Sequence, residues 1–118
     1  MSDITLRPLP SGPAEARFGI YAGEAYAGGI TVHSIDRENG SFSYGIAIAQ
    51  AMRRHGVASA AILLLLSRFS ADGFSRCIVE IYADNIPSRA LHQKLGFTQT
   101  ALFLKDGRET VRMERVLT

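Results

Sequence analysis

The sequence feature that most constrains the fold is an apolar run near the middle of the chain. Residues 57–66 read VASAAILLLL and are interrupted only by Ser59. The run is about half the ~20 residues that a membrane-spanning helix needs. It is apolar around most of a helical circumference, so we expect a largely buried helix over residues 56–70, ended by Gly73. The rest of the chain must therefore provide a surface that covers this helix.

Strand-like segments flank the expected helix on both sides. FSYGIAIA, residues 42–49, precedes it, and CIVEIYA, residues 77–83, follows it. In the first segment bulky residues alternate with small ones, which gives the strand one thick face and one thin face. A strand, a crossover helix and another strand in succession predict that the two strands lie side by side and parallel.

The other segments add antiparallel strands and a second helix. Asn39-Gly40 is a strong signal for a two-residue hairpin turn because both positions tolerate positive φ, and a second hairpin is expected about residues 106–107. PSRALHQKL, framed by Pro87 and Gly96, is expected to be a helix. The predicted fold class is therefore mixed α+β, with a mostly antiparallel sheet, one parallel strand pair and two helices. The remaining expected strands are residues 4–6, two strands within residues 17–36 joined near residues 22–23, and the two arms of residues 98–117.

Composition and charge exclude several classes of function. The chain has 118 residues, a formal net charge of +2 and one cysteine, Cys77. The length fits a single domain over residues 1–118. One cysteine cannot form an internal disulfide, and with three histidines it gives no metal-ligand spacing, so we expect no metal. The basic residues form no block or stripe, which argues against nucleic acid. The start MSDITLRPLP lacks the features of a signal peptide, so we expect a cytoplasmic protein without a membrane segment.

RRHGVA, residues 53–58, places three potentially cationic side chains where the helix dipole is already positive. The N–H groups of a first helical turn have no intrahelical partners and suit a phosphate or pyrophosphate. Gly56 and Ala58 would let such an anion approach the backbone, and Arg53 and Arg54 would complete its neutralisation. The alternative is a solvated basic loop in front of a buried helix, and a short glycine motif alone does not separate the two.

Two motifs taken together resemble the GNAT N-acetyltransferase superfamily. RRHGVA matches its Q/R-x-x-G-x-G/A motif, and DNIPSRALHQKLGF, residues 84–97, resembles its later segment that runs from an asparagine to KLGF. IDRENGSFSYGIAIA is similar to the central hairpin of the family. Asn85, Ser88 and KLGF resemble in particular the subgroup that includes the ribosomal-protein-alanine acetyltransferases. The resemblance covers roughly residues 15–118.

The resemblance implies an enzyme that binds acetyl-CoA and transfers its acetyl group to a primary amine. The amine would belong to a small molecule or a protein N-terminus and would attack directly in a ternary complex. The family's two central parallel strands splay apart, and the pantetheine arm of acetyl-CoA lies in the gap. The residues that the resemblance assigns to acetyl-CoA are Ile46, Ala47, Ile48, Arg53, Arg54, His55, Gly56, Val57, Ala58, Asn85 and Ser88.

Two side chains are candidate donors to the departing CoA thiolate. His92 falls where many family members carry a tyrosine with that role, and a histidine can also donate; the alternative is a surface residue of the helix. Ser88 is the second candidate, with capping of the helix as its alternative. Asn85 would hold the cofactor or order an Asx-type turn before Pro87.

The general base is left open by the sequence. Some relatives carry a carboxylate on the strand before the pyrophosphate loop, where this chain has Ser43-Tyr44-Gly45. The nearest well-placed carboxylate is Glu80 on the later strand, and the alternative is that it lines the sheet or pairs with an arginine. His33 would act through a water molecule, or else be a plain strand residue.

The region that shapes the acceptor site in this family is shortened here. Family members usually have two helices between the first and second strands, but only residues 9–17 link them in this chain, and one helix averages ~11–12 residues. We therefore expect a fold that lacks these two helices. Either a homodimer rebuilds the acceptor wall, or the protein is an acetyl-CoA-binding module with little transferase activity.

Overall fold

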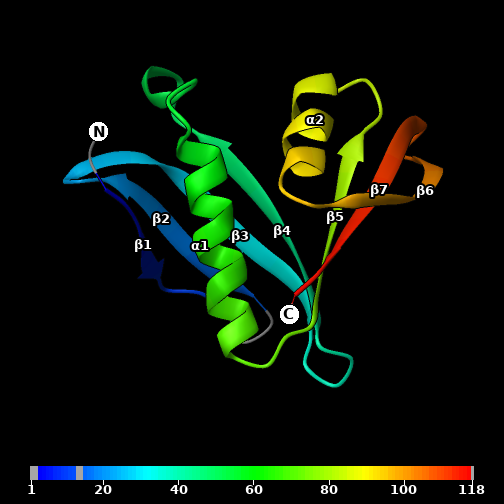
Figure 1. Ribbon diagram of the computed structural model, residues 1–118, viewed down its shortest axis with the longest axis horizontal. Coiled ribbons are helices and arrows are strands. Elements are labelled where there is room, and N and C mark those ends of the chain that lie inside the picture. The colour runs from blue at the N-terminus through cyan, green and yellow to red at the C-terminus, as the bar shows by residue number, and fades with distance from the viewer. Residues whose placement is uncertain (1–2, 13–14, 118) are drawn as a thin grey trace.

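The computed structural model describes residues 3–12 and 15–117, which form one seven-stranded sheet with α-helices packed on it. The elements are β1 (Ile4–Leu9), β2 (Ala16–Ala22), β3 (Ala25–Asp36), β4 (Ser41–Ile48), a short 3-10 helix (Gln50–Met52), α1 (Val57–Ala71), β5 (Arg76–Tyr82), α2 (Ile86–Lys94), β6 (Thr98–Lys105) and β7 (Arg108–Val116). The strand order across the sheet is β1-β2-β3-β4-β5-β7-β6. Both helices lie on the same side of the sheet, α1 in front of β2 and β3 and α2 next to the carboxyl end of β5 (Figure 1).

β4 and β5 are the parallel pair that the sequence predicts. Their register contains only the pairs Ser41–Arg76 and Phe42–Cys77. Beyond these pairs the two strands separate toward their carboxyl ends, and a V-shaped gap opens between them (Figure 1). The other neighbouring strands are antiparallel. The expected mixed α+β architecture is confirmed.

Phe42 anchors the helix-covered face of β4 at the point where the parallel pairing ends. Its ring stacks on Phe69 of α1 with ring centroids 4.3 Å apart, and it meets Phe74 edge-on at 5.6 Å. Aromatic pairs in these geometries contribute about 0.5–1.5 kcal/mol each beyond the burial of their area. This cluster therefore fixes α1 against the sheet beside the gap.

α1 is buried along one side only, whereas the sequence predicts a largely buried helix. Ile62 and Leu65 are fully buried, but Leu63 is 46% exposed and Leu64 is 41% exposed. A sheet face covers only the side of a helix that rests on it, and Leu63 and Leu64 lie on the other side. The prediction was wrong for this outer side.

The two hairpin turns differ in length. Asp106 and Gly107 both have positive φ, 51° and 76°, and they form the expected two-residue turn between β6 and β7. Between β3 and β4 the turn is longer and spans residues 37–40. There the Asp36 carboxylate accepts hydrogen bonds from the backbone N–H and the side-chain amide of Asn39, at 3.0 and 2.8 Å. Because these bonds close a wider loop, the expected two-residue turn at Asn39-Gly40 was wrong.

The link between β1 and β2 is short, as the sequence predicts. It spans residues 10–15, and its described residues, 10–12 and 15, form no helix. In the described part of the chain the second face of the sheet therefore has no helix over it. Among the same residues no helix is long and apolar enough to cross a membrane. The interpretation of residues 1–118 as one domain stays a prediction.

Candidate active site

A cavity of about 210 Å³ lies where β4 and β5 separate. Residues 44–46 of β4, residues 79–82 of β5 and the first turns of α2 line it, so backbone groups that have lost their parallel partner face an open space. A larger hollow of about 460 Å³ lies between α1 and the end of β7, but Arg115 is the one ionisable residue that lines it. The smaller cavity therefore has the richer chemistry. Its lining residues are Tyr44, Gly45, Ile46, Val79, Glu80, Ile81, Tyr82, Asn85, Ser88 and His92.

The backbone of β4 alternates between its neighbour β3 and the gap. The Ala47 carbonyl faces β3 so closely that a Cβ on Gly28 would collide with it. The Ile48 carbonyl points the other way and accepts a hydrogen bond from Arg53 Nε at 3.2 Å. In an antiparallel pair, alternate residues direct their backbone groups to the same side, so Ile46 shares the orientation of Ile48. Of the predicted pantetheine contacts, Ile46 and Ile48 thus present polar backbone to the gap, and Ala47 presents it to β3.

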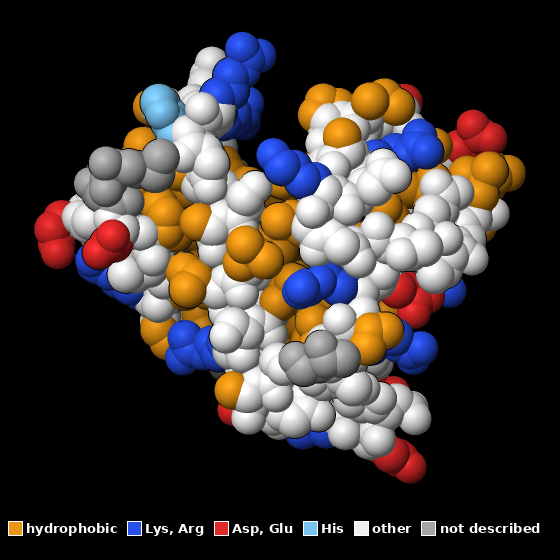
Figure 2. Space-filling model, viewed as in Figure 1, with side chains coloured by type: hydrophobic (Ala, Val, Ile, Leu, Met, Phe, Trp, Pro, Cys, Tyr) orange, Lys and Arg blue, Asp and Glu red, His pale blue; other side chains and the backbone are white. Residues whose placement is uncertain are grey.

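The basic loop, residues 53–56, lies at the carboxyl end of β4 and leads into α1. Its residues are exposed, and Gly56 has φ 75°, the left-handed conformation that glycine adopts most easily. Among the described residues no side chain caps α1, and its first bond joins the Ala60 N–H to the Gly56 carbonyl at 3.1 Å. The N–H groups of residues 57–59 therefore lie ahead of the helical hydrogen-bond ladder. Figure 2 shows Lys and Arg side chains at this end of the molecule, separated by a hollow from the lobe that contains α2.

His92 and Tyr44 form a buried hydrogen-bonded pair beside the cavity. His92 Nε2 lies 2.8 Å from the Tyr44 hydroxyl, and His92 Nδ1 lies 2.8 Å from the Ser88 carbonyl oxygen. A carbonyl only accepts, so the neutral ring carries its hydrogen on Nδ1, and Nε2 accepts from the Tyr44 hydroxyl. His92 is 4% exposed and Tyr44 is 6% exposed. The alternative that His92 is a surface residue was therefore wrong.

Burial favours the neutral form of both members of this pair. It lowers the pKa of His92, although the hydrogen bond with the Ser88 carbonyl opposes that shift. It also raises the pKa of the Tyr44 phenol well above its usual value. A neutral imidazole that accepts and a neutral phenol that donates are consistent with the hydrogen-bond directions above.

Tyr44 was not predicted as a site residue. The alternation in FSYGIAIA places it on the bulky, core-facing side of the strand together with Phe42, and that position suggests packing. The signal that could have identified it is its hydroxyl, because a buried tyrosine usually finds a hydrogen-bond partner. That partner is distant in sequence, so the pair becomes visible only in the folded chain.

Asn85 and Ser88 lie at the start of α2 and line the cavity. The Asn85 side-chain oxygen accepts the Ser88 N–H at 3.3 Å and so caps the helix. The alternative that Ser88 caps α2 was therefore wrong, since Ser88 lies inside the first turn. Its hydroxyl oxygen is 3.5 Å from His92 Nδ1. The structure thus brings Asn85, Ser88 and His92 together at one wall of the cavity.

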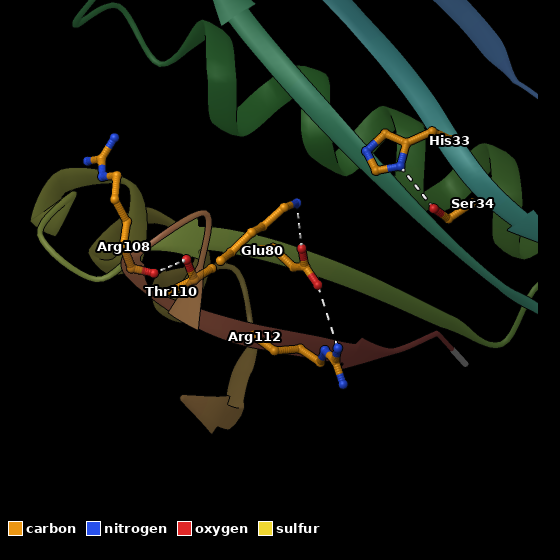
Figure 3. A network of polar contacts seen from close by, with 7 residues as sticks. His33, Ser34, Glu80, Arg108, Thr110 and Arg112 are labelled. Atoms are coloured by element: carbon orange, nitrogen blue, oxygen red, sulfur yellow. Dashed lines mark hydrogen bonds and ion pairs between the residues drawn. The ribbon is translucent and has the colours of Figure 1, made fainter. Parts of the chain in front are cut away.

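Glu80 also lines the cavity, but its carboxylate does not join Asn85, Ser88 and His92. Its neighbours Val79 and Ile81 are buried on the helix-covered side, so the Glu80 side chain extends from the opposite face. There its carboxylate accepts from Lys105 Nζ at 2.9 Å and pairs with Arg112 at 3.5 Å, as Figure 3 shows for the second contact. The hydrogen bond from Lys105 lowers the pKa of Glu80, and burial opposes the shift. The carboxylate is therefore charged and engaged with cations.

Two further side chains with possible chemistry, His33 and Cys77, do not line the cavity. His33 is exposed and bonded to the neighbouring Ser34 hydroxyl at 3.1 Å (Figure 3). Cys77 is fully buried, and burial raises its pKa to about 12, so it stays a thiol. Within residues 3–12 and 15–117 no three His, Cys, Asp or Glu side chains gather as a metal site would require. Whether the protein works without a metal stays a prediction.

Comparisons with known proteins agree with this geometry. An SPbeta prophage-derived uncharacterized N-acetyltransferase of Bacillus subtilis (strain 168), YokL, is 37% identical over 71 residues, which is 59% of this chain. The match spans only 40% of that relative's length. Mutant forms of the spermidine/spermine N-acetyltransferase SpeG from Vibrio cholerae superpose with a TM-score of 0.86 over 98% of this chain and 95% of theirs, at 18% identity. The ribosomal L7/L12 alpha-N-protein acetyltransferase RimL superposes with a TM-score of 0.80 over 88% of this chain and 70% of its own, also at 18% identity.

At these identities the solved structures show a shared fold. The decisive match is the model of the acetyltransferase (GNAT) family, which covers residues 3–97 and so includes the basic loop, the splayed strands and α2. The chain therefore belongs to the acetyltransferase (GNAT) family.

Proposed function

We propose that the protein is an N-acetyltransferase that moves the acetyl group of acetyl-CoA to a primary amine by direct attack in a ternary complex. The observation that carries the proposal is the cavity between β4 and β5. The buried Tyr44–His92 pair lines this cavity, and the basic loop before α1 follows the carboxyl end of β4. An anion site and a polar cavity joined by free strand backbone suit a ligand with a diphosphate at one end and a thioester at the other.

In this proposal the pyrophosphate of acetyl-CoA binds at residues 53–58. Arg53, Arg54 and His55 supply positive charge, and the N–H groups at the start of α1 supply donors. The pantetheine arm follows β4 and bonds to the backbone of Ile46 and Ile48, the two residues whose polar groups face the gap. Asn85 stands where the arm enters the cavity. These contacts leave the thioester beside Ser88 and His92.

Direct transfer is favoured because Cys77, the one cysteine of the chain, is not available to form a covalent thioester intermediate. The Cys77 thiol is buried and protonated. Glu80 is poorly suited to be the general base, since Lys105 and Arg112 already hold its carboxylate. The amine must nonetheless be neutral when it attacks. An α-amine with a pKa of ~7.7–8.0 meets that condition far more easily than a lysine side chain with a pKa of ~10.4.

We expect the acceptor to be an α-amine, such as a protein N-terminus, for this reason. The resemblance of Asn85, Ser88 and KLGF to the ribosomal-protein-alanine acetyltransferases favours the same class. Two of the structural neighbours are named for different acceptors, spermidine or spermine in one and a ribosomal protein in the other, so the fold accommodates both. The discriminating comparison is therefore between a peptide with a free N-terminal alanine and a polyamine.

The test is a CoA-release assay across a panel of amines, with mass spectrometry of the product. We expect release that depends on the amine and equals the acetylated product, strongest for α-amines. Tight acetyl-CoA binding without release for any acceptor would instead support an acetyl-CoA-binding module. The short link between β1 and β2 favours that alternative, because family members usually have two helices there that shape the acceptor site.

We further expect a homodimer in the cytoplasm. The sheet face opposite α1 and α2 has no helix over it in the described residues, and a second copy could form the missing wall of the acceptor site. Light scattering coupled to size exclusion measures the mass in solution. A monomer at every concentration used in the activity assay would contradict a shared site.

A further inference from the structure

We infer that Tyr44 and His92 act as one proton-transfer unit in acetyl transfer, with the Tyr44 hydroxyl touching the reacting atoms and His92 holding the proton behind it. The inference rests on the proposed transferase function and adds a catalytic residue, Tyr44, to it. It also changes the role of His92 from a direct donor to a residue that acts through Tyr44.

The hydrogen bonds of His92 exclude direct contact between its ring nitrogens and a substrate. Nδ1 donates to the Ser88 carbonyl and Nε2 accepts from the Tyr44 hydroxyl, both at 2.8 Å. Both nitrogens are thus occupied, and the ring is 4% exposed. Tyr44 and His92 both line the cavity, but the Tyr44 oxygen uses only its hydrogen toward His92 and keeps lone pairs. The polar atom that can reach from this pair into the cavity is therefore the Tyr44 oxygen.

The ring of His92 is held in position on three sides. Besides its two hydrogen bonds, it meets the Phe97 ring edge-on with centroids 5.0 Å apart. The Tyr44 ring lies 5.9 Å away and is inclined to it by 29°. A ring fixed in this way cannot turn toward the cavity without breaking a bond to Ser88 or Tyr44. The pair is therefore preorganised for transfer along the line from Nε2 to the Tyr44 oxygen.

The proton steps balance without any further reactant. The amine attacks the thioester carbon, and the new C–N bond leaves the nitrogen positively charged. A nitrogen proton passes to the Tyr44 oxygen while the Tyr44 hydroxyl proton passes to His92 Nε2. When the C–S bond breaks, its electron pair leaves on sulfur. His92 then returns its proton to Tyr44, and Tyr44 gives its own to sulfur, so that an amide and a CoA thiol remain.

One hydroxyl serves both steps because the nitrogen and the sulfur are attached to the same carbon. The direction of transfer is also favourable. A thiol has a pKa of ~8.5 and an unperturbed imidazole a pKa of ~6.5, so a proton on His92 moves readily to a thiolate. Burial lowers the pKa of His92 further and shortens the life of the charged ring.

The experiment is a double-mutant cycle with Tyr44→Phe, His92→Gln and the combined variant, measured with the best acceptor of the panel. Tyr44→Phe removes only the hydroxyl group. We expect kcat to fall by about 10²–10⁴-fold and the Kd for acetyl-CoA to stay within about threefold of the wild-type value. Because the two residues act as one unit, the combined variant should fall no further than the more damaging single variant. Tyr26→Phe, an exposed tyrosine of β3, is the matched control and should keep wild-type kcat.

Three results would overturn the inference. A Tyr44→Phe enzyme with wild-type kcat removes the catalytic role of Tyr44 and leaves the transferase function standing. Single losses that multiply in the combined variant show two independent roles. No turnover by the wild type with any amine removes the proposed function and this inference together.

A measurement on the wild type keeps the test decisive even if a variant fails to fold. The ¹⁵N spectrum of histidine distinguishes the two neutral tautomers of His92. We expect the Nδ1–H tautomer, with Nε2 as acceptor. An Nε2–H tautomer would leave the Tyr44 hydroxyl without its acceptor and would exclude the proton path.

Discussion

Replacement of Gly56 by alanine is expected to weaken acetyl-CoA binding beyond its effect on the fold. Gly56 precedes α1 with φ 75°, and an L-residue in this left-handed region costs roughly 1–2 kcal/mol. A Cβ at this position would meet no described heavy atom within 4 Å, so the stability loss contains backbone strain and no clash. For a domain of this size, each 1 kcal/mol lowers the melting temperature by roughly 3–6 °C.

Gly73→Ala is the matched control at the other end of the same helix. Gly73 has φ 94°, and a Cβ there also has no described neighbour within 4 Å. The two variants should therefore lose similar unfolding free energy. Only Gly56→Ala places a methyl group on the path of the pyrophosphate toward the start of α1. We expect this variant to lose tenfold or more in acetyl-CoA affinity, which corresponds to ~1.4 kcal/mol.

Urea unfolding measures the two stability losses, and isothermal titration calorimetry measures the acetyl-CoA affinities. Wild-type affinity in both variants would refute the assignment of the pyrophosphate to residues 53–58. An equal loss of affinity in both variants would refute it as well, because that pattern reflects strain in α1 and no specific contact at Gly56.

Four further changes test other parts of the account. Arg53→Ala combined with Arg54→Ala should weaken acetyl-CoA binding most strongly at low salt, and calorimetry at two salt concentrations that finds wild-type affinity would contradict it. Asn85→Ala should lower the unfolding free energy by about 0.5–2 kcal/mol in urea, since it removes the cap of α2. Glu80→Gln should lower it by no more than about 1 kcal/mol and keep kcat; a hundredfold loss of kcat in a folded variant would instead identify a base. Burial lowers the pKa of His92 in the folded chain below the ~6.5 of an unfolded histidine, so the unfolded chain binds more protons as the pH drops through this range. The stability that neutral His92 contributes is therefore complete above pH ~6.5 and is lost as the pH falls through the lower pKa of the folded chain. His92→Gln should flatten this dependence in thermal melts, and an unchanged slope would count against it.

The parts of the fold that follow from local pattern were predictable from the sequence. Strand alternation in FSYGIAIA, the apolar run after Gly56 and the positive-φ turn at residues 106–107 each depend on neighbouring residues. They give the parallel pair, the crossover helix and the last hairpin. The turn at residues 37–40 failed because one side chain, Asp36, closes the loop with bonds that a two-residue pattern does not contain.

The candidate site was predictable only in outline. The positions of the basic loop and of α2 follow from motifs, but the partners of the side chains depend on tertiary contacts. Tyr44 and His92 come from a strand and a helix far apart in the chain, and their bond exists only because α2 packs beside the gap. Glu80 of β5 similarly contacts Arg112 on the neighbouring strand β7 and Lys105 on β6, one strand further away. No spacing rule in the sequence encodes these pairs.

A crystal structure of the protein with acetyl-CoA would show directly whether the cofactor occupies the cavity between β4 and β5. We expect the pyrophosphate at the N–H groups of residues 57–59, the pantetheine arm along Ile46 and Ile48, and the thioester within hydrogen-bond distance of the Tyr44 hydroxyl. A cofactor bound elsewhere, or a thioester that lies away from the cavity between β4 and β5, would contradict it.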